Sequence, residues 1–225
     1  MKGRHEVKHY INMADYYVLR SRLNAVLMPD SHAGADGTYQ IRSLYFDTAD
    51  NKALLEKLNG VRKRAKYRIR YYNYNDSFIQ LEKKIKDGNA CIKVSETITR
   101  EEAEKIISGD IEWMRECDRP LLNELYVKMH NDGLKPSTIV EYTRDPFTFP
   151  AGNVRVTLDH HIRTGIKNID FFDPECVTVP IPDDVILLEV KWDNYLPDIV
   201  RDTVQMNSRR GSAFSKYAAC RAYDF

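Results

Sequence analysis

The chain has 225 residues, of which 43% are hydrophobic and 30% charged, and its formal net charge is +1. This composition is typical of a globular protein and excludes a disordered chain. The near-zero net charge gives no indication of a nucleic-acid partner. Four widely spaced cysteines form no zinc-binding pair and indicate a reducing compartment. No apolar run approaches the roughly 20 residues of a membrane span. We therefore expect a cytoplasmic protein that only a separate membrane-protein partner could hold at the inner face of a membrane.

Alternation of side chains, with β-branched and aromatic content, predicts eight strands. They lie at about 4–11, 39–47, 62–74, 77–86, 90–98, 137–147, 154–162 and 184–192. Turn residues at 73–76 and 86–89 predict two hairpins between neighbouring strands. Antiparallel strands interrupted by helices indicate an α+β fold. No linker interrupts the chain, so one domain over residues 1–225 is expected.

Capping and stop residues predict the helices between these strands. Asn12 caps a helix that runs to Met28, and Thr48 caps a short helix that ends at Gly60. Thr99 and Glu102 form a capping box, and Gly109 ends that helix. A fourth helix covers about 120–130, and one or two helices interrupted near Gly211 cover 197–223. Gly211 and Ser212 are expected to begin a helix whose first amides, with Ser215 and Lys216 nearby, face an anion.

Cations repeat on one face of the strand at 62–74. Arg64, Lys66, Arg68 and Arg70 share a parity and project together, whereas Tyr67, Ile69 and Tyr71 project from the opposite face. A charged face exposed to solvent would explain any single strand. However, like charges side by side destabilise a sheet, and further cations recur on most neighbouring strands. An eight-stranded closed barrel with these cations inside and helices outside would concentrate anions, and Arg and Lys suit phosphate oxygens.

A few carboxylates accompany the cations. Glu6, Glu82 and Glu189 alternate with Lys8, Lys84 and Lys191 on their strands. Each could form an ion pair with a neighbouring lysine. Each could also bind Mg²⁺ or Mn²⁺, which prefer carboxylate oxygens. Glu189 is the stronger metal candidate because it follows an apolar run, and Glu6 is the second.

Several common catalytic motifs do not occur. The sequence contains no phosphate-binding P-loop, no dinucleotide fingerprint and no Gly-x-Ser-x-Gly elbow. His160 and His161 are consecutive on a predicted strand. Their rings are therefore expected to point in opposite directions and not to share a metal.

Eight short motifs in order resemble the VTC domain, the polyphosphate polymerase domain of the triphosphate tunnel metalloenzymes, also called the CYTH superfamily. They are Arg4-x-Glu6-x-Lys8, the segment 41–48, the segment 67–72, Leu81-Glu82-Lys83-Lys84, Glu141-Tyr142-Thr143-Arg144, the segment 155–159, Leu188-Glu189-Val190-Lys191 and Phe214-Ser215-Lys216-Tyr217. The resemblance implies an eight-stranded antiparallel tunnel. It also implies transfer of the terminal phosphoryl group of ATP to a growing polyphosphate chain, with release of ADP.

The same resemblance implies the site residues. The predicted catalytic residues are Lys8, Arg68, Arg70, Lys84 and Lys216. The predicted substrate-binding residues are Arg42, Lys93, Arg144, Arg155, Lys191 and Ser215. Glu189 with Glu6 is expected to hold Mn²⁺ or Mg²⁺. ATP and polyphosphate are the expected partners, and nucleic acid is not.

Two departures keep alternatives open. The hydrolytic and cyclase branches favour Glu at the position of Arg4, so Arg4 points toward the VTC branch. Ala213 stands where the family often has a lysine, which leaves one phosphate contact and the identity of the substrate open. One alternative is a hydrolase of triphosphate or nucleoside triphosphates on the same tunnel. The other is a non-catalytic module that binds polyanions or RNA, with Tyr72 and Tyr74 available for base stacking.

Overall fold

The computed structural model describes residues 4–88, 90–181, 185–206, 211 and 213–224. The chain divides into two compact units, each assembled from separate segments. The first unit comprises residues 1–40, 142–162 and 180–215, and the second comprises 41–141, 163–179 and 216–225. Strands β3 (Tyr39–Asp47), β7 (Lys135–Phe149) and β8 (Val154–Thr164) contribute residues to both units.

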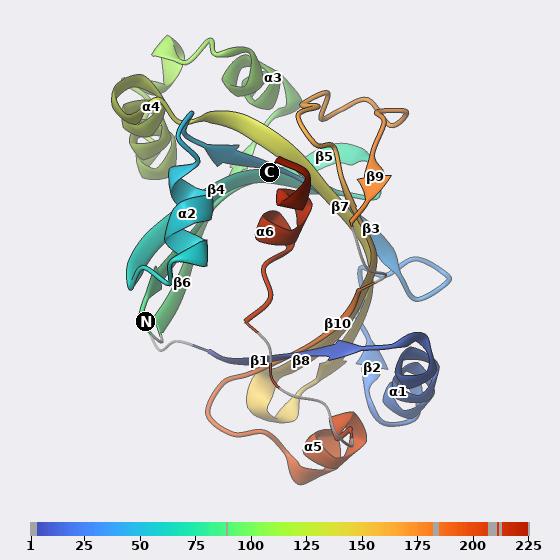
Figure 1. Ribbon diagram of the computed structural model, residues 1–225. Helices are drawn as coiled ribbons and strands as arrows, with labels where there is room; N and C mark the ends of the chain where they lie inside the picture. Colours follow the sequence, from blue (N-terminus) through green and yellow to red (C-terminus); the bar gives the residue numbers. More distant parts are fainter. Residues whose placement is uncertain (1–3, 89, 182–184, 207–210, 212, 225) are drawn as a thin grey trace. The chain divides into compact units, whose positions relative to one another are not determined.

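The first unit is an antiparallel sheet with helices on its apolar face (Figure 1). Strand β1 (His5–Ile11) pairs with β10 (Ile186–Trp192), β10 pairs with β8, and the short β2 (Met28–Pro29) pairs with β7. Helices α1 (Met13–Val26) and α5 (Asp198–Val204) pack Leu19, Leu23 and Val200 against Val156 and Leu188 of the sheet. A 3-10 turn, η2 (Ala151–Asn153), precedes β8. The opposite face of these strands carries the charged residues.

The second unit repeats this division of faces. Strands β3, β4 (Lys63–Tyr72), β5 (Asn75–Asp87) and β6 (Ala90–Ile98) form successive antiparallel pairs. Helices α3 (Arg100–Ser108) and α4 (Pro120–Asp132), with η1 (Glu112–Met114), pack Ile106 and Leu122 against Tyr67, Ile69 and Leu81. Helices α2 (Lys52–Leu58) and α6 (Lys216–Cys220), which are labelled in Figure 1, belong to the same unit, as does η3 (Ala222–Asp224). The apolar parity predicted for β4 is therefore the helix-covered one, and its cations lie on the other face.

The strand order confirms an antiparallel α+β fold. Paired strands follow the order β1-β10-β8-β7-β3-β4-β5-β6, with β2 beside β7 and β9 (Val179–Pro180) beside β8. All eight predicted strands are present, and β2 and β9 are short additions. The prediction of a closed barrel is not confirmed, because β1 and β6 end the path and pair on one side only in the part of the chain that is described. Alternation assigns faces within a strand, but closure also depends on strand tilt and shear, which alternation does not encode.

Two of the predicted helix caps, those of α1 and α3, are confirmed. Asn12 accepts a hydrogen bond from the Asp15 amide, and Thr99 does the same with Glu102, each in a reciprocal capping box. The prediction for α2 is confirmed in part: the residue that precedes this helix is Asn51, but the Lys52 amide donates to the Thr48 hydroxyl at 3.1 Å. The amides of Ala53 and Leu54 donate to the Asp47 carboxylate at the end of β3.

The C-terminal segment also differs from its prediction. Gly211 forms an isolated antiparallel bridge with His9 and does not begin a helix. Ser212 lies outside the described residues, and α6 begins at Lys216, directly after Ser215. The bridge to β1 depends on a residue 202 positions earlier in the sequence, and no local motif predicts it.

Candidate functional site

Four charged residues of alternating sign meet on β1 and β10 in the first unit. Lys8 lies opposite Glu189 in the register, and Glu6 lies opposite Lys191. Lys8 Nζ is 2.6 Å from Glu6 Oε1 and 3.2 Å from Glu189 Oε1. Lys191 Nζ is 3.1 Å from Glu189 Oε2 and 3.7 Å from Glu6 Oε2. We call these four residues the charged quartet.

Burial makes the charged quartet a strong electrostatic feature. Glu189 is only 5% exposed, so its charge needs the surrounding cations. Burial alone lowers the pKa of Lys8, but the carboxylates of Glu189 and Glu6 outweigh burial and raise that pKa. Lys8 therefore keeps its positive charge throughout the physiological pH range.

Arg144 on β7 extends the charged quartet. Its Nε and Nη2 donate to the two carboxylate oxygens of Asp159 at 2.6 and 2.8 Å, and Nη2 also lies 3.8 Å from Glu189 Oε2. Asp159 is fully buried, so this forked contact fixes the guanidinium. Asp159 is not among the predicted site residues, but it shares its strand parity with Thr157 and Arg155. That shared parity is the signal in the sequence that places Asp159 on the charged face.

Oxygen donors at Glu189 fit a hard divalent cation. Thr157 lies opposite Glu189 in the register, and its buried Oγ1 has no hydrogen-bond partner among the described residues. The described part of the chain holds no group of three or more His, Cys, Asp or Glu side chains that could bind a metal by themselves. Mg²⁺ commonly uses one or two carboxylates and takes its remaining ligands from water and substrate phosphates. Glu189, Glu6 and the Thr157 hydroxyl match that pattern.

Arg155 lies at the next position on the same face of β8. Its Nη2 is 3.1 Å from Asp30 Oδ2 and donates to the Tyr39 hydroxyl. Its buried Nε has no hydrogen-bond partner among the described residues. Arg155 lies opposite Lys191 in the register, so the predicted substrate-binding residues Arg144, Arg155 and Lys191 lie in one unit.

A second group of cations surrounds Glu82 on β5 in the second unit. Arg68 Nε lies 2.6 Å from Glu82 Oε2, and Lys93 Nζ lies 2.6 Å from Glu82 Oε1. Arg68 also donates to the Tyr45 hydroxyl, and Arg70 donates to Ser43 Oγ at 2.9 Å. Burial alone raises the pKa of Glu82, but Arg68, Arg70 and Lys93 together hold it well below its usual value. The predicted residues Arg68, Arg70 and Lys93 are thus held close together by neighbouring strands.

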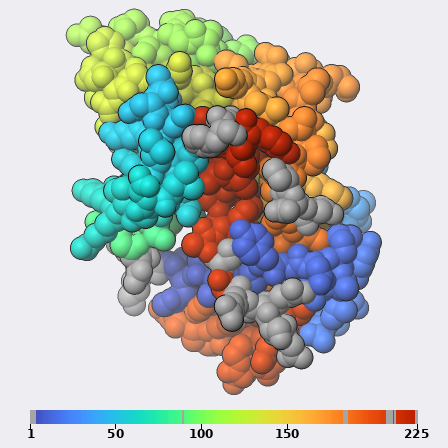
Figure 2. Space-filling model, in the orientation of Figure 1, coloured from blue at the N-terminus to red at the C-terminus, as the bar shows by residue number. Residues whose placement is uncertain are grey.

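Lysines form a row beside this group. Lys66 lies opposite Lys84, and Lys84 lies opposite Lys93, on three consecutive strands. The Lys66 ammonium is 4.8 Å from the ring centroid of Tyr217 on α6. Figure 2 shows α6, in red, beside α2, in cyan. Lys216 is the first residue of α6 and belongs to the same unit as this row.

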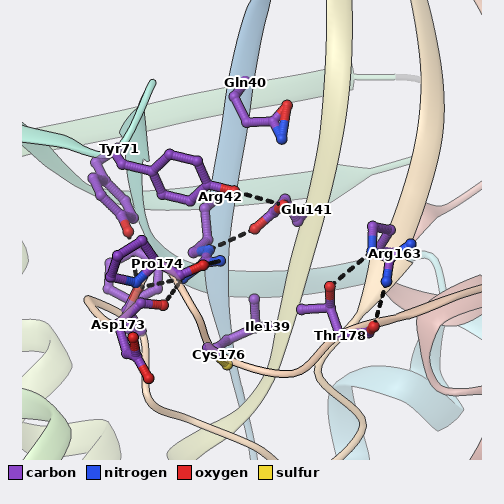
Figure 3. A network of polar contacts seen from close by, with 12 residues as sticks. Gln40, Arg42, Tyr71, Ile139, Glu141, Arg163, Asp173, Pro174, Cys176 and Thr178 are labelled. Atoms are coloured by element: carbon purple, nitrogen blue, oxygen red, sulfur yellow. Dashed lines mark hydrogen bonds and ion pairs between the residues drawn. The ribbon is translucent and has the colours of Figure 1, made fainter.

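Arg42 has a different environment from the other predicted substrate residues. It shares its parity on β3 with Leu44 and Phe46, which belong to the helix-covered core, and it is 2% exposed. Figure 3 shows its guanidinium between Glu141 and the segment near Asp173 and Pro174. Nε is 2.6 Å from Glu141 Oε2, and Nη1 donates to the carbonyls of Phe171 and Asp173. These contacts anchor the 165–179 segment, and contact between Arg42 and substrate stays a prediction.

The histidine pair contradicts its prediction. The Nδ1 atoms of His160 and His161 are 2.9 Å apart, and the two ring centroids are 4.6 Å apart. His161 has φ of 50°, which breaks the strict alternation of an extended strand. His160 Nε2 also lies 2.9 Å from the buried Asp145, which Arg20 contacts from α1. The rings therefore lie beside each other and not on opposite faces.

Comparison with known families identifies the chain. The VTC domain family model matches residues 3–225. The chain belongs to the VTC domain family. The resemblance seen in the eight sequence motifs is thereby confirmed. A search of curated proteins found no match.

Comparison with solved structures found matches to this VTC domain at low sequence identity. One is a Bacillus halodurans protein described as a "putative adenylate cyclase", with a TM-score of 0.53 and 13% identity over 84% of this chain and 80% of that chain. Another is the PH1012 protein of Pyrococcus horikoshii, with a TM-score of 0.45 and 14% identity over 89% and 85% of the two chains. The first likeness shows a common fold. Across the described part of the VTC domain, no helix combines the length and apolarity that a membrane crossing requires.

Proposed function

We propose that this VTC domain is a polyphosphate polymerase that transfers the terminal phosphoryl group of ATP to a growing polyphosphate chain with the help of Mn²⁺ or Mg²⁺. The observation that carries the proposal is the buried Glu189, which lies between Lys8 and Lys191 and close to Arg144. A carboxylate among several cations can bind a metal and a polyanion together.

The reaction needs charge neutralisation more than proton transfer. A terminal phosphate oxygen of the chain, already ionised at neutral pH, attacks the γ-phosphorus of ATP in line with the bond to the β-phosphate oxygen. That bond breaks and ADP leaves. In the first unit Lys8 and Arg144 would bind phosphate oxygens, and in the second unit Arg68, Arg70 and Lys84 would do the same. These fixed cations orient the phosphates without reorganisation during the reaction.

Glu189 and Glu6 would hold the divalent metal, with the Thr157 hydroxyl as a further oxygen donor. When bound, Mn²⁺ or Mg²⁺ supplies positive charge that stabilises the developing charge on the phosphoryl oxygens. Ion pairing already holds the Glu189 carboxylate in place. Lys8 and Lys191 lie at this carboxylate and would donate to phosphate oxygens beside it.

Product analysis tests the proposal directly. The protein is incubated with ATP and Mn²⁺, with and without EDTA, and the products are resolved on a polyacrylamide gel stained for polyphosphate. We expect long-chain polyphosphate and ADP only in the sample that contains free metal. Release of ADP and orthophosphate without polymer would favour the hydrolase of the same superfamily. Indifference to ATP together with metal-independent RNA affinity would favour the binding module.

A further inference from the structure

Three lysines occupy directly opposed positions on adjacent strands of the second unit. Lys66 on β4, Lys84 on β5 and Lys93 on β6 follow one another across the sheet. Directly opposed like charges destabilise a sheet. Lys93 turns toward Glu82 at 2.6 Å, which offsets part of the repulsion at that end of the row. The other end of the row has a different environment.

Several cations and an aromatic ring lie around Lys66. Lys57 on α2, Arg64 on β4 and Lys84 on β5 are among these cations, and Asp47 at the end of β3 is a nearby acid. The Tyr217 ring from α6 lies 4.8 Å from its ammonium.

Asp47 is heavily committed to other donors. Its carboxylate accepts hydrogen bonds from the amides of Ala53 and Leu54 in α2 and from the hydroxyl of Tyr217. It is therefore a weak counter-charge for Lys66.

Burial and these cations lower the pKa of Lys66 to about 7. Lys8 in the first unit shows the contrast. It is buried as well, but two carboxylates contact it directly and its pKa rises. The difference between the two lysines is the sign of the surrounding charge, and an anionic ligand would change that sign at Lys66.

We propose that Lys66 is a phosphate ligand that takes up a proton when a polyphosphate or a nucleoside triphosphate binds, so that binding at the lysine row is coupled to pH. The neutral amine accepts one proton from water or a buffer acid. The resulting ammonium then donates to a phosphate oxygen. No covalent bond to the ligand forms. This inference rests on the proposed function, because it assumes that phosphate chains bind this face of β4.

The sign of the pH dependence follows from the direction of the change. A bound phosphate raises the pKa of Lys66, so the contribution of Lys66 to affinity is fully present below pH 7 and falls as the pH rises above 7. In that range each pH unit should weaken binding by up to about tenfold more than in a protein with a permanent cation at this position.

Isothermal titration calorimetry with sodium tripolyphosphate measures the proton directly. Titrations at pH 8 in two buffers of different ionisation enthalpy give the number of protons taken up on binding. We expect the wild type to take up close to one proton more than Lys66→Arg, which carries a permanent charge. Lys63→Arg is the matched control, since Lys63 is an exposed lysine of the same strand, and it should behave as the wild type.

The outcomes separate this inference from the proposed function. Tripolyphosphate binding with equal proton uptake in wild type and Lys66→Arg overturns the role of Lys66 and leaves the phosphate site standing. Absence of tripolyphosphate binding to the wild type overturns both. Nuclear magnetic resonance of ¹³C-methylated lysines in the free protein gives a second readout. A resonance that is absent in Lys66→Arg should titrate near pH 7, and a midpoint above pH 9 overturns the inference.

Discussion

Two buried carboxylates, Glu82 and Glu189, each contact several cations but have different predicted roles. Glu82 is 2% exposed and contacts Arg68 and Lys93. Removing one partner of a buried ion pair leaves the others uncompensated, which is far more costly than losing a surface pair. Glu82 is therefore expected to hold the cations of the second unit in place, whereas Glu189 is expected to serve the metal.

Replacement of Glu82 tests the first of these roles. Glu82→Gln should lower the free energy of unfolding at pH 7 by about 3 kcal/mol, because the half-buried Arg68 and the buried Arg70 lose their counter-charge. The folded protein holds the pKa of Glu82 below its unfolded value near 4.3. The stabilisation is thus fully present above about pH 5 and is lost as the pH falls below that value. Urea unfolding at pH 7 and pH 3.5 should show the difference between wild type and variant shrinking at the lower pH.

Replacement of Glu189 tests the second role. Glu189→Gln should reduce polymer synthesis by about 100-fold or more, since the amide is a poor ligand for Mn²⁺. Binding of tripolyphosphate without metal should be retained or strengthened, because Lys8 and Lys191 lose their competing carboxylate. Electron paramagnetic resonance of Mn²⁺ supplies a readout independent of turnover. Glu101→Gln on the exposed surface of α3 is the control. Normal synthesis by Glu189→Gln would refute the metal assignment.

The sequence predicted the sheet face on which a side chain lies better than it predicted the residue that the side chain contacts. Parity placed Arg68 and Arg70 correctly on the face opposite Tyr67 and Ile69, because that geometry is local. The partner of Arg42 could not be predicted in the same way, since Glu141 lies 99 positions later in the sequence. An arginine that binds substrate and an arginine that forms a buried ion pair cannot be told apart from the sequence around them.

Among the elements, the helices were predictable where a cap lies within four residues of its amide. The pairs Asn12–Asp15 and Thr99–Glu102 met that condition, and so did Thr48, whose hydroxyl accepts from the Lys52 amide. The contribution of Asp47, which accepts from the Ala53 and Leu54 amides from the preceding strand, could not be predicted in this way. His161 shows the corresponding limit for strands. A single positive φ angle changes the direction in which a side chain points, and the neighbouring residues do not predict the positive φ of His161.

The capping box of α3 gives a prediction at this scale. Thr99→Ala removes the acceptor of the Glu102 amide, at 3.1 Å from Thr99 Oγ1, and should cost about 1 kcal/mol of stability. For a chain of this size the melting temperature should fall by about 2–4 °C. Thr99→Ser keeps the acceptor and should recover most of the loss in calorimetry. Equal melting of Thr99→Ala and wild type would contradict the structural role of the cap.

At the level of the whole molecule, a net charge of +1 conceals a strong separation of charge. Helices cover one face of the strands in each unit, and the cations gather on the other face. Composition could not reveal this separation, but strand parity could. Whether the end strands meet could not be predicted, because closure depends on the summed tilt of all strands and on no single residue.

Charge separation predicts stabilisation by polyanions. At a concentration 100 times its Kd, tripolyphosphate should stabilise the folded protein by about 2.7 kcal/mol, which corresponds to a rise of several degrees in melting temperature. The rise should shrink in high salt. Arg68→Ala should reduce it, whereas Arg62→Ala, which removes an arginine with an 85% exposed side chain, should not. An equal reduction by both variants would indicate non-specific charge attraction.

The pairing of β1 with β10 has a consequence for how the charged quartet forms. Lys8 and its partner Glu189 lie 181 positions apart in the sequence. A slip of this pairing by two residues would set Glu6 against Glu189, so the correct alignment also avoids a repulsive one. Each of the two strands supplies only one carboxylate and one lysine of the charged quartet, so the quartet exists only in molecules in which β1 and β10 have paired.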